Sequence, residues 1–459
     1  MTNYDAIVIG TGTGGGSLAT RLANAGLKVA AVERKLFGGT CLNVGCTPTK
    51  ALVASAYAAH LARRGAEYGV AIEGRVAVDM KRVKARKDAI LAPRQAGFEQ
   101  WLRGTKNCTV YHDHARFLSP HVVMVGGVVL SADKIFITVG GRAAAPPIEG
   151  LETVEYLTNV SMLDIDFLPP HLLVVGGSYI GLEFAQMYRR FGSEVTVIEM
   201  APRLVPREDE DVSEAIRDIL EKEGVHVRLN AKCIELGRRG HEITAGLDCA
   251  GGPPAVTGTH LLLATGRRPN TDDLGLEHAG VKLDGRGYIV VDDQLRTNVP
   301  GIWAVGDCNG RGAFTHTAYN DFEIVAANLL DNDPRKVTDR IPAYALFIDP
   351  PLGRVGLTEA EVRKRGRPAL IGRRAMTDVA RAVEKSETQG FMKVLVDAAS
   401  KEILGAAILG VGGDEAIHAI ADLMYAKAPY TVMQRAVHIH PTVSELIPTM
   451  LGELKPLQP

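Results

Sequence analysis

Short apolar runs that end at glycine-rich turns and lead into amphipathic helices recur along the chain. Residues 6–9 (Ala-Ile-Val-Ile) and 172–175 (Leu-Leu-Val-Val) are unbroken apolar runs, and glycines follow each of them. The spacing of apolar residues beyond those glycines predicts helices over 17–25 and 182–191. Strand, glycine turn and helix in this order are typical of a parallel sheet covered by helices. The pattern therefore predicts an α/β fold.

The pattern changes at about residue 341. Strand-like segments at 390–396 and 403–409 alternate there with helical patterns at 359–365 and 414–425. This mixture predicts a C-terminal α+β domain. A chain of 459 residues is long enough for about three domains.

The first glycine turn has the spacing of a dinucleotide-binding fingerprint. Gly10, Gly12 and Gly15 follow the first apolar run, and in such a turn glycine permits a tight bend, close approach of a pyrophosphate and close packing of the helix. Glu33 ends the next apolar run about twenty residues on, where a carboxylate can accept from a ribose hydroxyl. Strand, helix and acid together predict a dinucleotide site.

The second glycine turn repeats this arrangement. Gly176, Gly177 and Gly181 follow 172–175, with Ser178 in the place of the middle glycine, and the next apolar run leads into Glu199. We expect the small serine side chain to be tolerated. Two dinucleotide sites in one chain imply that electrons pass between two cofactors.

Glu199 also bears on the choice of nicotinamide. A carboxylate at this position accepts from a free 2′-hydroxyl and repels a 2′-phosphate, which favours NADH over NADPH. Arg203 and Arg207 follow closely in the sequence and would attract a 2′-phosphate, so NADPH is the alternative.

Composition narrows the class of protein. Apolar residues make up 46%, charged residues 23%, and the formal net charge is −1, so no basic field indicates a nucleic-acid partner. No apolar run reaches the ~20 residues that span a bilayer, and the N-terminal five residues lack the basic region of a signal peptide. We therefore expect no nucleic-acid or membrane partner and a cytoplasmic location, where a disulfide is more often catalytic than structural.

Residues 38–50 (Gly-Gly-Thr-Cys-Leu-Asn-Val-Gly-Cys-Thr-Pro-Thr-Lys) carry the most specific chemistry. Cys41 and Cys46 are close enough in sequence to close a small disulfide ring, and an apolar helical pattern follows at 51–53. A thiol near a helix N-terminus has a lowered pKa and is available as a thiolate. The alternatives are a structural disulfide or two unrelated buried thiols. The remaining cysteines, which show no pairing pattern and are expected to be incidental, are Cys108, Cys233, Cys249 and Cys308.

This segment resembles the redox-active disulfide signature of the FAD-dependent pyridine nucleotide-disulfide oxidoreductases, a family that includes glutathione reductase, dihydrolipoamide dehydrogenase and mercuric reductase. The resemblance extends over essentially the whole chain. It implies FAD in the first dinucleotide unit and NADH or NADPH in the second. It also implies that Cys46 is the flavin-proximal thiol and that Cys41 is the interchange thiol that attacks substrate.

The same resemblance assigns further residues near the flavin. Lys50 would lie beside it, paired with Glu183, and Tyr179 would cover it until the nicotinamide displaces the ring. The alternative is that Glu183 is a surface residue on an amphipathic helix. The other cofactor-binding residues that the resemblance implies are Gly39, Thr40, Gly140, Gly266, Gly306 and Asp307.

These last residues lie in segments that match the family. Residues 297–307 resemble its second FAD segment, in which Asp307 would bind the ribityl chain. Residues 138–142 and 264–270 resemble the crossings out of and back into the flavin domain, and a helix is expected to open at Thr315. The implied domains are an FAD-binding domain at 1–150 and 268–340, an NAD(P)H-binding domain at 151–267 and a dimerisation domain at 341–459.

Near the C-terminus, His440 and Glu445 match the family's His-Pro-Thr-x-x-Glu motif. The resemblance makes His440 the acid-base that serves the thiols of the other subunit in a homodimer. A carboxylate on one ring nitrogen fixes the tautomer and raises the basicity of the other. His438 in the same segment is expected to pack or to support the site.

The resemblance leaves the substrate open between a metal ion and a small disulfide. Thr47, Thr49 and the run 206–209 look closest to mercuric reductase-like proteins and to a copper-reducing enzyme of hypochlorite defence. Residues 450–459 hold no cysteine pair of the kind that delivers Hg(II), and no resident metal is expected. The alternatives are a dihydrolipoamide dehydrogenase that reduces NAD⁺ and a redox-sensing flavoprotein, against which the His440–Glu445 pair argues.

Overall fold

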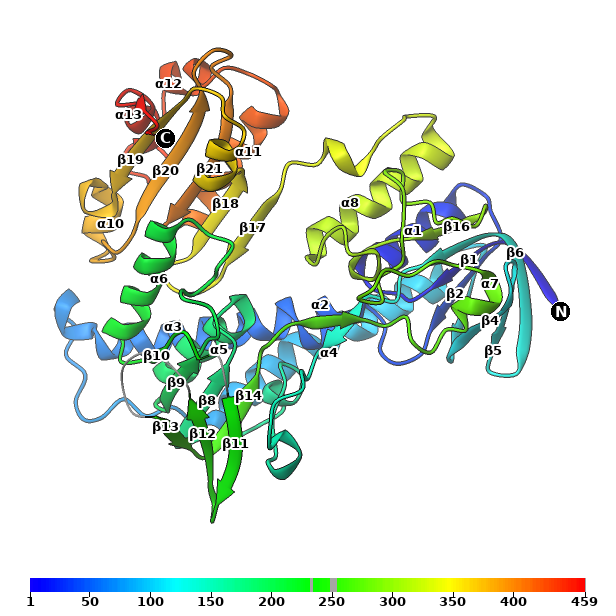
Figure 1. The fold of residues 1–459 in the computed structure, drawn as a ribbon, viewed down its shortest axis with the longest axis horizontal. Helices are drawn as coiled ribbons and strands as arrows, with labels where there is room; N and C mark the ends of the chain where they lie inside the picture. Colours follow the sequence, from blue (N-terminus) through cyan, green and yellow to red (C-terminus); the bar gives the residue numbers. More distant parts are fainter. Residues whose placement is uncertain (232–233, 248–253, 459) are drawn as a thin grey trace.

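The computed structural model describes residues 1–231, 234–247 and 254–458 (Figure 1). Its first sheet runs parallel in the order β3-β2-β1-β6-β16, and β5 and β4 continue from β6 as antiparallel strands. Its strands are β1 (Thr2–Ile9), β2 (Val29–Glu33), β3 (Cys108–His112), β4 (Ala115–Ser119), β5 (Val122–Val125), β6 (Val128–Ile137) and β16 (Ile302–Ala304). The helices α1 (Thr13–Asn24) and α8 (Thr315–Ala326) pack against each other and share its core.

The helix α1 begins at Thr13, earlier than the predicted 17. Three consecutive glycines, 14–16, lower the helix propensity of this turn, which hides it from the apolar pattern. They are needed for packing, because a Cβ on Gly14 would lie 2.6 Å from the carbonyl oxygen of Ala318 on α8. Close contact between helices therefore overrides local propensity here.

The second sheet is parallel throughout, in the order β10-β9-β8-β14. Its strands are β8 (His171–Val175), β9 (Glu194–Ile198), β10 (His226–Arg228) and β14 (His260–Leu263), with the helices α5 (Tyr179–Phe191) and α6 (Glu210–Lys222). The helix α5 begins three residues before the predicted 182, directly after the glycine turn. A small antiparallel sheet is formed by β11 (Ile234–Arg239), β12 (Glu242–Leu247) and β13 (Ala255–Gly258).

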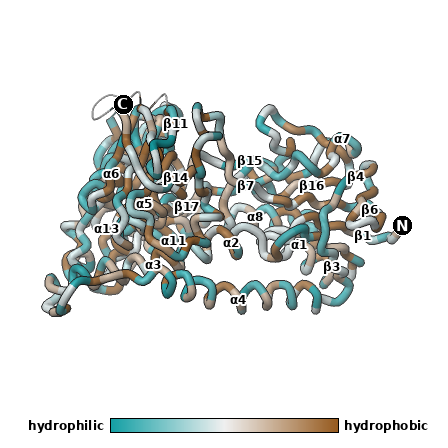
Figure 2. Tube along the Cα trace, turned by 90° about the horizontal axis from the view of Figure 1, so that it is seen from below, coloured by the Kyte–Doolittle hydropathy of each residue, from teal (hydrophilic) through white to brown (hydrophobic). Residues whose placement is uncertain are grey.

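Two short strands join the parallel units. The strand β7 (Gly141–Ala143) pairs with β15 (Arg267–Pro269), so the outward and return crossings of the chain lie side by side. Two long helices, α3 (Cys46–Arg63) and α4 (Met80–Gly104), pack on each other and border the molecule (Figure 2). Because α3 also packs on α5, the cysteine segment is held against the second dinucleotide unit.

The C-terminal sheet is antiparallel, in the order β17-β18-β21-β20-β19-β22. Its strands are β17 (Ala343–Leu346), β18 (Leu352–Gly356), β19 (Ala369–Ala375), β20 (Phe391–Asp397), β21 (Ile403–Leu409) and β22 (Lys455–Pro456). The helices of this part are α9 (Glu359–Lys364), α10 (Ala380–Glu384), α11 (Gly413–Tyr425), α12 (Thr431–Arg435) and α13 (Leu446–Leu451). Buried residues of β17, β18 and β21 share one core with α5, so this sheet and the second unit are packed together.

The predicted α/β fold, with two Rossmann-like units and a C-terminal α+β unit, is confirmed by these sheets. Among the described residues, no helix combines the length and the apolar character that crossing a membrane requires.

Candidate active site

The first glycine turn forms a tight cradle at the start of α1. Gly10 has a φ of +100°, and a Cβ on Gly15 would lie 2.2 Å from the Gly10 carbonyl oxygen. Gly12 is open on its outer side, where a Cβ would meet only Gly39 at 3.9 Å. Glu33 Oε2 accepts from the Thr11 amide at 3.0 Å. The turn therefore places open backbone at the N-terminus of α1, where a dinucleotide pyrophosphate fits, and a carboxylate beside it, where the ribose fits.

The second turn has the same construction at the start of α5. A Cβ on Gly181 would lie 2.0 Å from the Gly176 carbonyl oxygen, which requires glycine there. Glu199 Oε2 accepts from the Gly177 amide at 2.6 Å, and its Oε1 accepts from Ala201 at 2.8 Å. The acid is thus fixed at the glycine turn. Arg207 is exposed, and Arg203 donates to the Pro206 carbonyl at 3.4 Å.

The other residues that the resemblance assigns to cofactor binding lie near β7 and β15, where the chain crosses between the two units. Burial raises the pKa of Asp307, and Arg267 Nη2 lies 3.4 Å from its Oδ2. A Cβ at Gly140 or Gly266 would meet no atom within 4 Å, so both positions are open. Gly306, with a φ of +78°, precedes Asp307 and donates its amide to the buried Asp321 at 2.8 Å.

Cys41 and Cys46 lie on consecutive helices. Cys41 belongs to α2 (Gly39–Val44), as does Thr40, and Cys46 is the first residue of α3. Both thiols are free in this structure. Gly45 between the helices permits the close turn, since a Cβ there would lie 2.8 Å from the Thr40 carbonyl oxygen. The predicted thiol at a helix N-terminus is therefore present.

The surroundings of the two thiols separate their acidities. A hydrogen bond from Cys41, then one from Thr315 and the charge of Lys50, lower the pKa of Cys46 from 9.0 to about 6. The same thiol–thiol hydrogen bond and burial raise the pKa of Cys41. Cys46 Sγ lies 3.3 Å from Thr315 Oγ1. At neutral pH Cys46 is the thiolate of the pair and Cys41 keeps its proton.

Lys50 and Glu183 form an ion pair in which the carboxylate is buried. Lys50 Nζ lies 2.7 Å from Glu183 Oε2, and the Glu183 side chain is 7% exposed. The interpretation of Glu183 as a surface residue is therefore wrong. Its Oε1 accepts from the Phe347 amide at 3.1 Å, and Lys50 Nζ lies 4.4 Å from the centroid of the Phe347 ring. Sequence reasoning missed Phe347, which reaches the pair from the C-terminal part of the chain.

Tyr179 is the first residue of α5. Its ring packs edge-on against Phe314 at 5.9 Å and against Tyr344 at 5.5 Å between centroids. Phe314 immediately precedes Thr315, the hydrogen-bond partner of Cys46. The Tyr179 ring therefore contacts the residue next to the one that bonds Cys46. The sequence predicted the helix start at Thr315 but gave no signal for its contact with Cys46 or for the two ring neighbours.

His440 and Glu445 form the predicted pair. His440 Nδ1 lies 3.0 Å from both carboxylate oxygens of Glu445, and the peptide bond between His440 and Pro441 is cis. The His440 side chain is 74% exposed, whereas that of Glu445 is 14% exposed. The flanking helices α12 and α13 lie at the far end of the C-terminal sheet from α2 (Figure 1). His438 is half-buried beside them.

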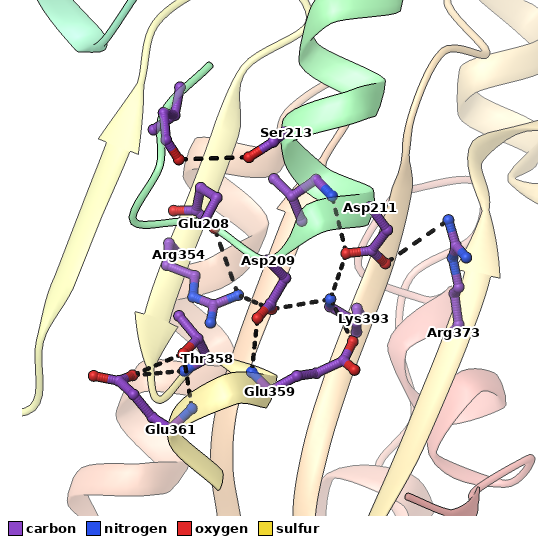
Figure 3. Close-up of polar contacts among 12 residues, drawn as sticks. Glu208, Asp209, Asp211, Ser213, Arg354, Thr358, Glu359, Glu361, Arg373 and Lys393 are labelled. Atoms are coloured by element: carbon purple, nitrogen blue, oxygen red, sulfur yellow. Dashed lines mark hydrogen bonds and ion pairs between the residues drawn. The ribbon is translucent and has the colours of Figure 1, made fainter. Parts of the chain in front are cut away.

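A buried charge cluster joins the second unit to the C-terminal sheet (Figure 3). Lys393 Nζ lies 3.0 Å from Asp209, 2.8 Å from Asp211 and 2.6 Å from Glu359. The ammonium thus stands among three carboxylates that could otherwise ligate a cation.

Of the cysteines expected to be incidental, Cys308 is buried and Cys108 is half-buried, while Cys233 and Cys249 lie outside the described residues.

Comparisons with known proteins match the whole length of the chain. The family model described as pyridine nucleotide-disulphide oxidoreductase matches residues 4–321, and the model for the dimerisation domain of these proteins matches 342–451. A probable pyridine nucleotide-disulfide oxidoreductase, RclA of Escherichia coli (strain K12), is 34% identical over 99% of this chain and 100% of its own. A mercuric reductase of Streptomyces lividans is 34% identical over 97% of this chain and 95% of its own. A dihydrolipoyl dehydrogenase of Thermus scotoductus is 35% identical over 97% of this chain and 96% of its own.

Solved structures agree with these matches. The structure titled as the HOCl-induced flavoprotein disulfide reductase RclA from Escherichia coli matches with a TM-score of 0.90, covering 98% of this chain and 100% of that one at 34% identity. Its Cu(II) complex matches with a TM-score of 0.89, covering 98% of this chain and 99% of that one at 33% identity.

Proposed function

Because the chain belongs to the pyridine nucleotide-disulphide oxidoreductase family, we propose that it is a flavin-dependent reductase of a metal ion or a small disulfide, with Cys41 and Cys46 as its redox centre. The observation that carries the proposal is the placement of the two thiols on the consecutive helices α2 and α3, with Cys46 at the start of α3 and 3.3 Å from Thr315 Oγ1. We further propose NADH as the preferred reductant. The position of Glu199 at the Gly177 amide supports this preference, because a ribose with a free 2′-hydroxyl fits there.

Each of the two glycine turns, with the acid that follows it, would bind one of the two cofactors. FAD, the cofactor of this family, would be held by the turn at Gly10, Gly12 and Gly15, by Glu33 and by Asp307. The nicotinamide nucleotide would be held by the second turn and Glu199. In this proposal the FAD domain comprises 1–150 and 268–340, the NAD(P)H domain 151–267 and the dimerisation domain 341–459. The pairing of β7 with β15 at the domain crossings supports this division.

The two cradles would hold FAD and the nicotinamide nucleotide, which together would supply hydride transfer and an electron pair for reduction of the Cys41–Cys46 disulfide. The chain's residues then act on the substrate. His440 takes the proton of Cys41, whose sulfur attacks a substrate disulfide to form a mixed disulfide and release one thiol. The Cys46 thiolate attacks the Cys41 sulfur, which releases the second product as a thiolate and closes the Cys41–Cys46 disulfide. Glu445 holds His440 Nδ1, so proton transfer takes place at Nε2.

We propose that the active site is completed in a homodimer. In the described chain, His440 makes no contact with the thiols, and two apolar side chains beside it, Val437 and Ile439, are 101% and 80% exposed. Such exposure of neighbouring apolar residues indicates an interface. A second subunit that covered them would bring its thiols to His440.

Two substrate classes follow from the relatives. The Escherichia coli relative has a solved Cu(II) complex, and another relative is a mercuric reductase, which supports a metal ion as the electron acceptor. The similarity to a dihydrolipoyl dehydrogenase supports the second candidate, oxidation of dihydrolipoamide by NAD⁺.

The test is consumption of NADH and of NADPH by the purified flavoprotein with Hg(II), Cu(II), lipoamide or glutathione disulfide. Cys41→Ser is the test variant, and Cys108→Ser, which removes a thiol on β3, is the matched control. Metal-dependent turnover that only Cys41→Ser abolishes supports the metal reductase. Rapid turnover on lipoamide alone supports the dehydrogenase. Full turnover in Cys41→Ser would remove the thiol mechanism from both.

A further inference from the structure

Arg381 joins the helix α10 to the turn that carries His440. Its Nη2 donates to the Pro441 carbonyl oxygen at 2.7 Å, and its Nε donates to the same oxygen at 3.2 Å. Hydrogen bonds from a charged donor are strong, and two of them from one planar guanidinium fix the direction of the group that accepts them. The carbonyl that follows His440 is therefore clamped from another element.

The turn itself, residues 436–442, has no buried side chain to hold it in place. Within it, Thr442 Oγ1 donates to the Ile439 carbonyl oxygen at 2.8 Å and accepts from the Glu445 amide at 3.3 Å. Among the described residues, the only hydrogen bonds that reach this turn from outside the segment α12 to α13 come from Arg381. The position of the turn between its two ends thus depends on this clamp.

Arg381 extends from a fixed base. Its neighbour on α10, Ala382, is fully buried and lies in one core cluster with Val443 and Ile447, which follow the turn in sequence. The helix α10 is therefore packed in the same core as the base of the turn, whereas the His440 side chain is 74% exposed. The guanidinium connects that core to the exposed part of the turn.

Glu445 and Arg381 constrain different parts of the histidine. The carboxylate lies 3.0 Å from Nδ1, so it sets the rotation of the ring and its tautomer. The clamp on Pro441 holds the backbone that carries the ring. Both matter for a proton-transfer group, because a displacement of about 1 Å can reduce a rate by about a hundred-fold.

We propose that Arg381 is a positioning residue that holds the backbone of this turn so that the His440 imidazole reaches the partner's Cys41. This inference rests on the proposed function, because it requires that His440 take the proton of Cys41 in a homodimer. Arg381 acts only through His440. Its removal therefore slows the steps that His440 performs and no others.

The test measures the rate at which iodoacetamide alkylates Cys41, since the thiolate is the reactive form. The flavin-containing protein carries Cys46→Ser, so that no disulfide forms, and peptide mass spectrometry identifies the alkylated residue. We expect Arg381→Gln to slow alkylation roughly five-fold, because Arg381 is 43% exposed and water replaces part of the lost bonds. Arg381→Lys keeps the charge and one donor, and its rate should be intermediate.

His440→Gln provides the background that separates positioning from a general effect on structure. Alkylation should already be slow in that variant, and adding Arg381→Gln should slow it no further, because the two residues act as one unit. A residue that only stabilised the fold would lower the rate in both backgrounds.

Arg363→Gln is the matched control. The Arg363 side chain is also 43% exposed, and its Nε donates to the Gln458 carbonyl oxygen at 3.0 Å. It also faces an acid of its own helix, Glu359 at 3.0 Å, as Arg381 faces Glu384 at 3.6 Å. Alkylation of Cys41 in this variant should proceed at the parent rate.

Three results would overturn the positioning role: an unchanged rate in Arg381→Gln, a further five-fold loss on adding it to His440→Gln, or equal losses in Arg381→Gln and Arg363→Gln. The proposed function fails in a different way. An unchanged rate in His440→Gln would reject the proton transfer and the positioning role with it. Failure of both NADH and NADPH to reduce the flavin of the wild type would reject the reductase, whatever the alkylation rates are.

Discussion

The hydrogen bond between Thr315 and Cys46 gives a quantitative prediction for Thr315→Val, which keeps the shape of the side chain and removes its hydroxyl. A hydrogen bond to a charged group contributes about 1.5–3 kcal/mol. Cys46 is partly exposed, so water replaces part of the lost bond and the lower end applies. Since one pKa unit corresponds to about 1.4 kcal/mol, we expect the pKa of Cys46 to rise by about one unit.

The higher pKa of Cys46 lowers the thiolate fraction in acidic solution and leaves it unchanged in alkaline solution. With its pKa at about 6, Cys46 is mostly thiolate at pH 6.5. A pKa about one unit higher reduces that fraction from about three-quarters to about one-quarter, and the loss is recovered above pH 8. Activity that depends on the thiolate should therefore fall at mildly acidic pH and be unchanged in alkaline solution.

The assay is the pH dependence of alkylation by iodoacetamide at Cys46, followed by peptide mass spectrometry in a Cys41→Ser background so that no disulfide forms. The comparison is between that background with and without Thr315→Val. Ser55→Ala, on the same helix as Cys46 and bonded to Ala51 and Arg86, is the control. A midpoint that moves by less than about 0.3 unit would refute the role given to Thr315.

Three further predictions address the dimer, the first cradle and the buried charges. Mixing Cys41→Ser and His440→Gln subunits should restore roughly a quarter of wild-type turnover, because each hybrid dimer has one intact site, and no recovery would place both residues in one subunit. Gly15→Ala should yield protein without flavin, measured by absorbance, since its Cβ would lie 2.2 Å from a carbonyl oxygen, whereas Gly97→Ala, with nothing within 4 Å, should retain flavin. Lys393→Met removes the buried ammonium that three carboxylates share and should lower the free energy of unfolding by about 3–5 kcal/mol in a urea titration, and a smaller loss than about 1 kcal/mol would contradict the burial of that charge.

The parts of the site that sequence reasoning found are those encoded locally. The glycine turns at Gly10 and Gly176 and the acids that follow them are set by strand, turn and helix within about thirty residues. The His440–Glu445 pair is likewise local, because five residues separate its members. The Lys50–Glu183 pair spans 133 residues and was found only through the family resemblance.

The parts that were missed depend on contacts between distant segments. Thr315 meets Cys46 across 269 residues, and Tyr344 meets Glu208 across 136. Glu208 follows an exposed Arg207 in a polar stretch, and charged residues of this kind are usually solvated. Its burial comes from packing against β17 and β18, which no local pattern reveals. The early start of α1 was missed for the same reason, since Gly14 is required by the close approach of Ala318 on α8.

The buried cluster around Asp209 also bears on the timescale of nucleotide entry. Asp209 accepts the amide of Glu359 at the start of α9 and contacts Arg354 and Lys393, so the loop after Arg207 is tied to the C-terminal sheet. A hinge between the two would have to separate these charges in a dry interior. Hinge motions of whole domains take microseconds to milliseconds, whereas rotation of a single side chain is far faster. With the second unit and the C-terminal sheet joined in this way, we expect nucleotide entry to be governed by local side-chain motion rather than by a hinge between these two parts.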